Sequence, residues 1–251
     1  MPQAGAMAHS DVQPNRWQNR RIGITGASGA LGRALTTRFL AEGAHVTGFT
    51  HSAPKDPSQD DGPKRWVQWS CGAEDVLRDE LKQLDVLVLN HGINPQGDQT
   101  PDQLTTSLEV NALSTWRLIR AFEACGQQAN TSWPREIWIN TSEAEIQPAV
   151  SPGYEISKRL IGQLVSIHGA VRSAEARKAL RIRKLVLGPF RSELNPIGLM
   201  DASFVAGQIV LQAGLGLNLI IVSPNPLTYV LMPLSELGRR LYSRALNRPG
   251  Q

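Results

Sequence analysis

Thr25-Gly26-Ala27-Ser28-Gly29-Ala30-Leu31-Gly32 joins a short apolar run, Arg21–Thr25, to an amphipathic stretch, Ala30–Glu42. Glycines allow the backbone to turn tightly and to approach a phosphate closely, while a helix N-terminus offers unpaired N–H groups and a partial positive charge. A strand, a glycine-rich turn and a helix in this order predict a phosphate-binding loop. The alternative is a tight strand-to-helix turn that binds nothing. The residues expected to bind are Gly26, Ser28, Gly29, Ala30, Leu31 and Gly32.

The same alternation of apolar and amphipathic stretches continues along the chain and indicates a parallel sheet with crossover helices. Strands are expected at Arg21–Thr25, His45–Thr50, Trp66–Ser70, Asp85–Asn90, Arg135–Ser142, Leu180–Gly188 and Leu217–Val222. Helices are expected at Ala30–Glu42, Ala73–Gln83, Pro101–Cys125, Pro152–Glu175 and Asp201–Ala213, and again after Pro226. The sequence therefore predicts a single α/β domain: a doubly wound parallel sheet of about seven strands with helices on both faces.

This domain is predicted to span residues 20–225. Residues 1–19 are polar and are predicted to form a flexible tail, residues 226–251 to form a helical extension of the same domain, and Ser52–Lys64 to form a loop.

The composition is that of an ordinary soluble globular protein, with 41% hydrophobic and 19% charged residues and a net charge of +4. No stripe of interleaved basic and aromatic residues is present, so nucleic-acid binding is not expected. No apolar run is long enough to cross a bilayer. Cys71 and Cys125 lack the spacing of metal ligands, so no metal site is expected, and a reducing, cytoplasmic location is the simpler interpretation.

Tyr154-Glu155-Ile156-Ser157-Lys158 places a phenol and an ammonium four residues apart, on the same face of a helix. A free phenol has a pKa of about 10. A nearby ammonium and a second positive charge lower that pKa and make the phenol a usable acid or base at neutral pH. Tyr154 and Lys158 are therefore predicted to be catalytic, with a solvated helix face as the alternative.

The glycine-rich turn and this pair resemble the motifs of the short-chain dehydrogenase/reductase family. Its single-domain members carry Thr-Gly, three residues, Gly, one residue and Gly. Here Ala30 replaces the middle glycine, and the spacing of Gly26, Gly29 and Gly32 is closer to that of the family's extended or atypical branches.

The family also places a serine at the end of the strand before the tyrosine. Ser142 ends such a strand and precedes Tyr154 by twelve residues, one fewer than usual. Thr141 has the usual interval, but adjacent side chains of a strand face opposite ways. Ser142 is therefore preferred, and Thr141 is the alternative.

Three further segments resemble the family at the ends of strands or in a helix. Asn90-His91-Gly92 matches Asn-Asn-Ala-Gly, which implies support of the sheet beside the cofactor. Asn111 matches the asparagine that holds a water linked to the lysine. Leu187–Ser192 resembles Pro-Gly-x-Val-x-Thr, which implies cofactor contacts by Gly188, Phe190 and Ser192. A packing role is the alternative for His91.

The resemblance implies a Rossmann-like fold and an oxidoreductase that transfers a hydride between a nicotinamide and a carbonyl or alcohol substrate. Tyr154 would donate the proton, Lys158 would lower its pKa and hold the ribose, Ser142 would polarise the carbonyl, and Asn111 would be the fourth catalytic residue. The alternatives are a non-catalytic nucleotide-binding module that senses redox state or docks a partner, and an epimerase or dehydratase. Relatives of this family imply a homodimer or homotetramer.

A weaker resemblance, carried by residues 140–145 and 187–196, is to the dehydrogenase-like half of cyanobacterial sterol desaturase/short-chain dehydrogenase proteins.

The second predicted strand ends in Thr50-His51-Ser52, without the acid that NAD-preferring relatives use to hold the ribose hydroxyls. Thr50, His51 and Ser52 are therefore expected to contact a 2′-phosphate. NADP(H) is the expected cofactor, and NAD(H) is the alternative.

After Pro226 apolar residues recur near the helical period, and the charges beyond Glu236 are all arginines. This helix is expected either to cap the core or to form a lid that meets a hydrophobic substrate and touches a membrane surface. The location would then be cytoplasmic or membrane-peripheral. Glu143 and Glu145, which follow Ser142, are expected to meet solvent or arginines.

Overall fold

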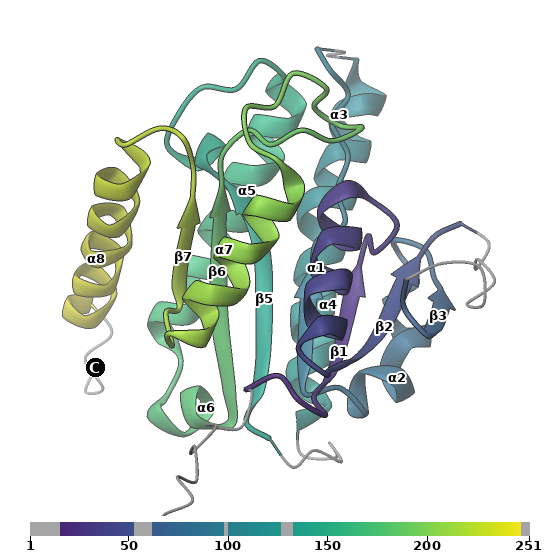
Figure 1. Cartoon of the computed structure of the whole chain (residues 1–251). Coiled ribbons are helices and arrows are strands. Elements are labelled where there is room, and N and C mark those ends of the chain that lie inside the picture. The colour runs from purple at the N-terminus through teal and green to yellow at the C-terminus, as the bar shows by residue number, and fades with distance from the viewer. Residues whose placement is uncertain (1–15, 53–61, 98–99, 127–132, 247–251) are drawn as a thin grey trace, which may run out of the picture.

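The strands form where buried apolar runs end at polar or glycine-containing turns. The computed structural model describes residues 16–52, 62–97, 100–126 and 133–246. Within these residues seven parallel strands form one sheet in the order β3-β2-β1-β4-β5-β6-β7 (Figure 1). They are β1 (Arg21–Thr25), β2 (His45–Thr50), β3 (Arg65–Gln68), β4 (Val86–Leu89), β5 (Arg135–Ser142), β6 (Leu180–Leu187) and β7 (Leu219–Val222). The predicted single-domain, doubly wound sheet is confirmed.

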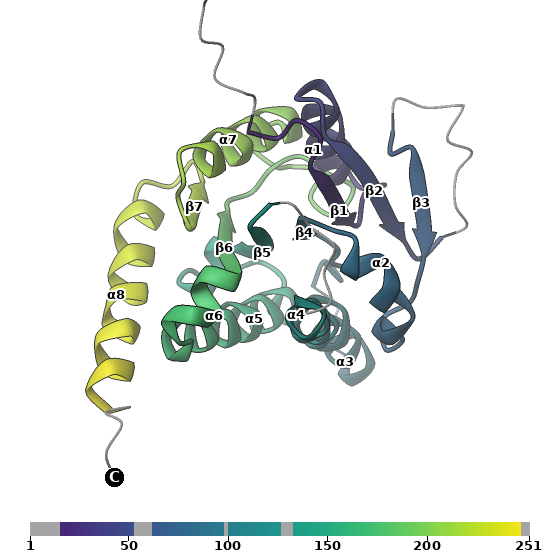
Figure 2. The same cartoon turned by 90° about the horizontal axis from the view of Figure 1, so that it is seen from below.

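Helices cover both faces of this sheet (Figure 2). On one face α1 (Ala30–Ala41) packs against α7 (Ala202–Gly214). The other face carries α2 (Arg78–Lys82), α3 (Pro101–Leu108), α4 (Thr115–Ala124), α5 (Pro152–Val171) and α6 (Ala174–Ala179). Because both faces are covered, a central strand such as β4, Val-Leu-Val-Leu, is buried along its whole length.

Three predicted helices are interrupted. The stretch 101–125 divides into α3 and α4, which are joined by a π-helical segment, η2 (Glu109–Ser114). The stretch 152–175 divides at Arg172, whose extended backbone ends α5, and Ser173, whose side chain caps α6. The stretch 73–83 starts as a 3₁₀ turn, η1 (Glu74–Leu77), before α2.

Trp17 belongs to the folded core, so the prediction of a flexible tail over residues 1–19 is wrong for residues 16–19. The Trp17 side chain is 3% exposed. Its ring lies edge-on against Phe39 and Trp138, with centroids 5.5 and 5.4 Å away. These aromatic contacts attach the segment before β1 to the core beneath α1. Residues 1–15 lie outside the described residues.

The C-terminal helix α8 (Thr228–Leu246) stands beside β7 at the edge of the sheet and packs on α5 (Figures 1 and 2). Its first turn adjoins the carboxyl end of β7, and the helix then runs back along the sheet. The sequence left two expectations for this helix, a cap on the core and a lid over the site. The body of α8 does not lie over the carboxyl ends of the strands, where a lid would be. Residues 247–251 lie outside the described residues.

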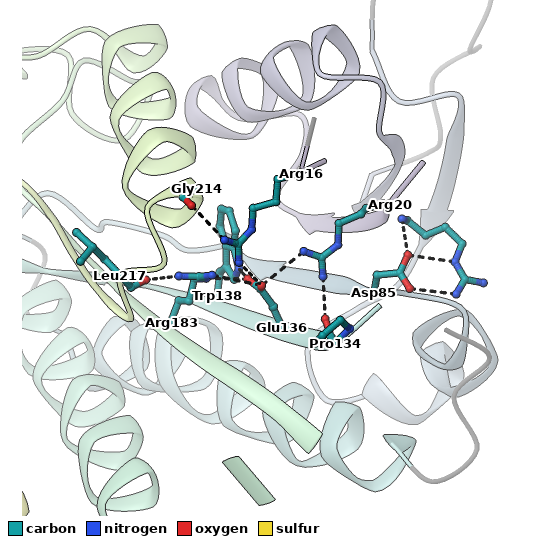
Figure 3. A network of polar contacts seen from close by, with 10 residues as sticks. Arg16, Arg20, Asp85, Pro134, Glu136, Trp138, Arg183, Gly214 and Leu217 are labelled. Atoms are coloured by element: carbon teal, nitrogen blue, oxygen red, sulfur yellow. Dashed lines mark hydrogen bonds and ion pairs between the residues drawn. The ribbon is translucent and has the colours of Figure 1, made fainter. Parts of the chain in front are cut away.

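Glu136, at the amino end of β5, is the centre of a buried ion-pair network (Figure 3). Its carboxylate accepts hydrogen bonds from Arg183 Nε at 2.7 Å, Trp138 Nε1 at 3.0 Å, Arg16 at 3.2 Å and Arg20 at 3.5 Å. Burial raises the pKa of Glu136, but the hydrogen bonds and positive charges of its partners outweigh burial and lower the pKa to about 2. The folded chain therefore holds Glu136 ionised.

Glu136→Gln is expected to lower the free energy of unfolding by about 3–5 kcal/mol at pH 7, because it leaves the buried Arg183 without its counterion. The depressed pKa adds a pH dependence. The wild-type stabilisation is present above the unfolded carboxyl pKa of about 4.3 and is lost as the pH falls towards 2. Urea unfolding across this pH range measures both effects.

The matched control is Asp79→Asn, which removes an exposed carboxylate paired with Lys82 and should change stability little. Equal stability of the Glu136 and Asp79 variants would contradict the role given to the network.

Candidate active site

The turn between β1 and α1 has a shape that depends on glycine. Gly26 has a φ of +63°, and a Cβ there would lie 2.9 Å from His91 Cα. A Cβ at Gly32 would lie 2.2 Å from the Gly26 carbonyl oxygen, so α1 packs directly on the turn. Gly29 is the N-cap of α1 and has no side chain to occupy the first-turn N–H groups. Those groups are the kind of donors that bind a phosphate.

Ser28, Ala30 and Leu31 complete this turn. The Ser28 carbonyl accepts a hydrogen bond from the Arg33 guanidinium, and Ala30 begins α1. The Leu31 side chain is buried in the core, which leaves its backbone to face a ligand. A close-packed glycine turn with an uncapped helix start fits the pyrophosphate of a dinucleotide.

His91, after β4, packs its side chain inside the edge of the sheet. Its Nδ1 lies 2.8 Å from Thr25 Oγ1, and its ring lies edge-on against Trp69. Burial, together with the positive charge of Lys158, lowers the pKa of His91 to about 3, so the imidazole is neutral. The backbone of His91 remains the part that faces Gly26.

A chain of hydrogen bonds connects the glycine turn to Lys158. Asn90 Nδ2 donates to the Gly26 carbonyl at 3.4 Å, and Asn140 Nδ2 donates to Asn90 Oδ1 at 3.0 Å. Lys158 Nζ then donates to the Asn140 carbonyl at 3.1 Å. The sequence predictions included Asn90 and Lys158 but missed Asn140, although an asparagine inside the apolar run of β5 is the signal that could have identified it.

Asn111 lies in the π-helical segment η2, and π-bulges are frequent at functional sites. Its amide accepts from the Ile93 N–H at 2.8 Å, and donates to the Ile93 carbonyl at 3.0 Å and to Ser157 Oγ at 2.9 Å. A Cβ at Gly92 would lie 2.9 Å from Asn111 Oδ1 and 3.8 Å from Lys158 Nζ. Asn111 therefore ties the segment after β4 to α5, close to Lys158.

The hydroxyls of Thr141 and Ser142 point to different partners. Thr141 Oγ1 donates to the Leu185 carbonyl of β6 at 3.1 Å, inside the sheet. Ser142 Oγ accepts the Ala144 N–H at 3.1 Å and interacts with the phenol of Tyr154. The geometry thus favours Ser142 over Thr141 as the partner of Tyr154.

The electrostatics around Tyr154 and Lys158 suit a proton donor. Burial raises the pKa of Tyr154, the Ser142 hydroxyl lowers it, and the charge of Glu143 raises it further, so the phenol is protonated at neutral pH. Burial also lowers the pKa of Lys158 to about 8, against the opposing charge of Glu145. Lys158 Nζ lies 5.8 Å from the centre of the Tyr154 ring.

The remaining predicted contacts lie in loops at the same carboxyl edge. After β2, Thr50 is buried and its Oγ1 accepts the Ser52 N–H at 3.2 Å, while His51 and Ser52 are exposed. After β6, Gly188 packs against Ser223 at the end of β7.

Phe190 and Ser192 belong to a closed loop after β6. Phe190 forms a bridge with Met200, and a Cβ at Gly198 would lie 2.0 Å from the Phe190 carbonyl carbon. Ser192 exchanges backbone hydrogen bonds with Asn195. Asn94, after β4, donates to the Leu194 carbonyl at 3.3 Å, so the two loops meet.

Glu143 and Glu145 lie in η4 (Glu143–Glu145). The expectation that they meet solvent or arginines is wrong for Glu145, whereas Glu143 is partly exposed. Glu145 is buried and accepts from Lys184 Nζ at 2.6 Å, which also donates to Glu236 Oε1 of α8 at 2.8 Å. A Cβ at Gly162 would lie 2.0 Å from the Glu145 carboxyl group, so this glycine admits the carboxylate.

Glu143 accepts hydrogen bonds from the hydroxyls of Ser223 and Thr228. Both carboxylates thus connect the turn after Ser142 to the C-terminal part of the chain.

Within the described ranges no cluster of three or more metal-binding side chains occurs. In the same residues no helix has the length and apolarity needed to cross a membrane.

Comparison with known proteins identifies relatives of this chain. Residues 22–169 match the NAD dependent epimerase/dehydratase family. A monoglucosyldiacylglycerol epimerase from Synechocystis sp. is 38% identical over 234 residues, which are 92% of this chain and 56% of that protein. A dTDP-6-deoxy-L-talose 4-dehydrogenase from Kitasatospora kifunensis is 28% identical over 75% of this chain and 60% of its own length. The chain therefore spans little more than half the length of these curated relatives.

Among solved structures, a short chain dehydrogenase from Burkholderia cenocepacia in complex with NADP superposes with a TM-score of 0.71 at 18% identity, covering 93% of this chain and 99% of that one. Aldohexose dehydrogenase from Thermoplasma acidophilum gives a TM-score of 0.68 at 16% identity, covering 83% and 94%. At these identities the likeness concerns the fold.

The fold and these matches place the chain in the short-chain dehydrogenase/reductase class. Within that class, the chain belongs to the NAD dependent epimerase/dehydratase family. The class expected from the glycine turn and from Tyr154 and Lys158 is confirmed.

Proposed function

We propose that this chain transfers a hydride between NADP(H) and a hydrophobic substrate that carries an alcohol or carbonyl group. One observation carries the proposal: Ser142, Tyr154 and Lys158 meet at the carboxyl edge of β5, and the Asn90–Asn140 hydrogen bond links Lys158 to the glycine turn. In open α/β sheets this edge, where the strand order reverses between β1 and β4, is where ligands bind.

Each residue has a separate task in this proposal. Tyr154 donates the proton to the substrate oxygen, and Ser142 donates a hydrogen bond to the same oxygen. The Lys158 ammonium holds the ribose and stabilises the phenolate, and Asn111 keeps the segment after β4 against α5. The nicotinamide supplies the hydride and, when oxidised, a second positive charge that opposes the raised pKa of Tyr154.

NADP(H) is favoured over NAD(H) by the loop after β2. Its exposed His51 and Ser52 follow the buried Thr50, and no acidic side chain ends this strand. An acid there would repel a 2′-phosphate, whereas hydroxyls and an imidazole can donate to one. Use of NAD(H) remains compatible with the same loop.

A non-catalytic, redox-sensing or partner-docking module is the less supported alternative, since a chain with that role does not require Tyr154 and Lys158.

Epimerisation is the second candidate and has a specific observation in its favour: the 38% identity to a monoglucosyldiacylglycerol epimerase over 92% of this chain. In an epimerase the same hydride is removed from a sugar carbon and returned to its other face. A glycolipid would also satisfy the expectation of a hydrophobic substrate.

Apolar side chains exposed near the site and on α8 support contact with a lipid phase. Ile197 and Leu199, in the loop after β6, are 86% and 75% exposed. On α8, Val230, Leu234, Leu237 and Leu241 face outward at a helical spacing. Arg240 is exposed beside them, and the acid of this helix, Glu236, is buried. We infer that the protein is cytoplasmic and binds peripherally to an anionic membrane. We also propose that it forms a homodimer or a homotetramer, and analytical ultracentrifugation would give the number of subunits.

Tyr154→Phe is expected to reduce turnover at least 100-fold, because it removes the proton donor, and to leave nucleotide affinity within about twofold. Lys158→Ala should impair both. The assays are NADPH oxidation across a panel of carbonyl compounds and conversion of monoglucosyldiacylglycerol to an epimer. An epimerase returns the hydride to the substrate, so it needs only a trace of nucleotide. Net oxidation or reduction consumes one nucleotide for each product molecule, and this stoichiometry distinguishes the two reactions.

Tyr242→Phe is the control, since Tyr242 is exposed on α8. Near wild-type turnover by Tyr154→Phe would show that the catalytic assignment is wrong.

Wild-type protein is expected to co-sediment with vesicles that contain anionic lipid, and Leu234→Gln combined with Leu237→Gln should weaken that binding. Arg240→Gln should weaken it mainly at low salt. Leu211→Gln, which changes an equally exposed leucine on α7, is the control. Vesicle binding that is insensitive to all of these changes would rule out α8 as the contact.

A further inference from the structure

Three arginines form ion pairs with the single carboxylate of Glu136, at the amino ends of the strands (Figure 3). They are Arg16 at 3.2 Å, Arg20 at 3.5 Å and Arg183 at 2.7 Å. Asp85, a second buried carboxylate at this end of the sheet, pairs with Arg21. Within the described residues the group around Glu136 therefore carries more positive than negative charge.

Arg181 adds a further positive charge beside this group. It lies in register with Glu136 on the neighbouring strand β6, and its side chain is exposed. Glu136 is bonded to Arg183 instead, and Arg181 forms no hydrogen bond or ion pair with any residue that the structure describes. Burial lowers the pKa of Arg183, and the charges of Arg181 and Arg16 lower it further, against the attraction of Glu136. These like charges are therefore close enough to repel one another.

Three of the four arginines line one small pocket. Its volume is about 230 Å³, and its lining residues are Arg16, Arg20, Trp133, Pro134, Glu136 and Arg181. Pockets for drug-sized ligands start at about 300 Å³, so this one suits a smaller molecule and not a second dinucleotide. Both oxygens of Glu136 already accept hydrogen bonds from its partners. The pocket therefore offers a ligand mainly positive charge and N–H donors.

Arg20 contributes a buried donor that the protein does not use. Its side chain is only 3% exposed, and it donates to the Pro134 carbonyl at 2.8 Å and to Glu136 at 3.5 Å. Its Nε–H is buried and has no hydrogen-bond partner among the described residues. Leaving a buried donor of a charged group unpaired is costly, and such groups commonly mark the place of an ion or a water.

The pocket also has an apolar side, which Trp133 and Pro134 provide. The Trp133 side chain is 42% exposed, and the guanidinium carbon of Arg20 lies 5.8 Å from the centre of its ring. An exposed indole beside arginine donors can pack against a flat apolar group while the guanidinium groups bind an anion.

We propose that this pocket binds a small phosphate monoester, whose phosphate contacts Arg16, Arg20 and Arg181 and whose apolar ring packs on Trp133. Planar guanidinium groups match phosphate oxygens in paired hydrogen bonds, and a phosphate dianion offsets more of the excess positive charge than a carboxylate does. The pocket lies at the amino ends of β5 and β6, whereas Tyr154 and Lys158 lie at the carboxyl edge. The proposal is therefore independent of the proposed function.

Phenyl phosphate is the probe, added with NADPH at saturation so that the glycine turn does not take up the phosphate. The signal is the indole N–H resonance of Trp133, identified by its loss in Trp133→Phe. Phenyl phosphate should shift this resonance saturably, and Arg181→Gln should weaken binding about tenfold because it removes a charged donor. Phenol, which has the ring without the phosphate, should give no saturable shift. Glycerol 3-phosphate, the fragment that a phospholipid headgroup shares, should bind more weakly because it has no ring to pack on Trp133.

Arg240→Gln is the matched control. Arg240 is also exposed and has no ion pair with another described residue, but it lies on α8, away from the pocket. This variant should bind phenyl phosphate as the wild type does, and both variants should keep the wild-type melting temperature. A Trp133 resonance that phenyl phosphate does not move, or equal weakening by Arg181→Gln and Arg240→Gln, would overturn the site. Binding of glycerol 3-phosphate as tight as that of phenyl phosphate would overturn the ring contact with Trp133.

Discussion

The rest of the site depends on a row of hydrogen bonds that crosses the carboxyl edge of the sheet. It runs from the Gly26 carbonyl through Asn90 and Asn140 to the Lys158 ammonium. These groups belong to the ends of β1, β4 and β5 and to α5, so the row fixes the glycine turn relative to α5. The N–H and C=O groups of a partly buried side-chain amide both need hydrogen-bond partners. A shift of one strand would leave several of these groups without a partner.

The two ends of the sheet have different physical tasks. At the amino ends, Glu136, Arg20 and Arg183 form a buried network of ion pairs. At the carboxyl ends, Tyr154 and Lys158 are desolvated, Lys158 forms no ion pair with another described residue, and the pKa values of both shift in the direction of the neutral forms. Perturbed groups of this kind cluster at functional sites. The link to α8, through Lys184 and Glu236, connects the turn after Ser142 to the edge of the molecule.

Sequence patterns predicted the strands because a buried parallel strand is a short apolar run with polar or glycine boundaries, as in β4. They predicted Ser142 because it ends a strand, and Tyr154 because its phenol and the Lys158 ammonium are four residues apart on one helix. The sequence did not predict the break of α5 at Arg172 or the π-helical segment at Asn111. Both depend on local backbone and capping geometry, and neither changes the helical spacing of the apolar residues enough to be recognised. Glu145 was assigned to solvent or arginines because its partner, Lys184, is distant in sequence, and Trp17 was missed because a single aromatic residue has no period.

The most direct test of the account is a calorimetric titration of the full chain with NADPH and with NADH. The account predicts saturable binding at one nucleotide per chain, with NADPH tighter than NADH, because the glycine turn, the uncapped start of α1 and the loop after β2 form one site. Tighter binding of NADH would contradict the assignment of Thr50, His51 and Ser52. Absence of saturable binding of either nucleotide to the folded chain would contradict the central claim.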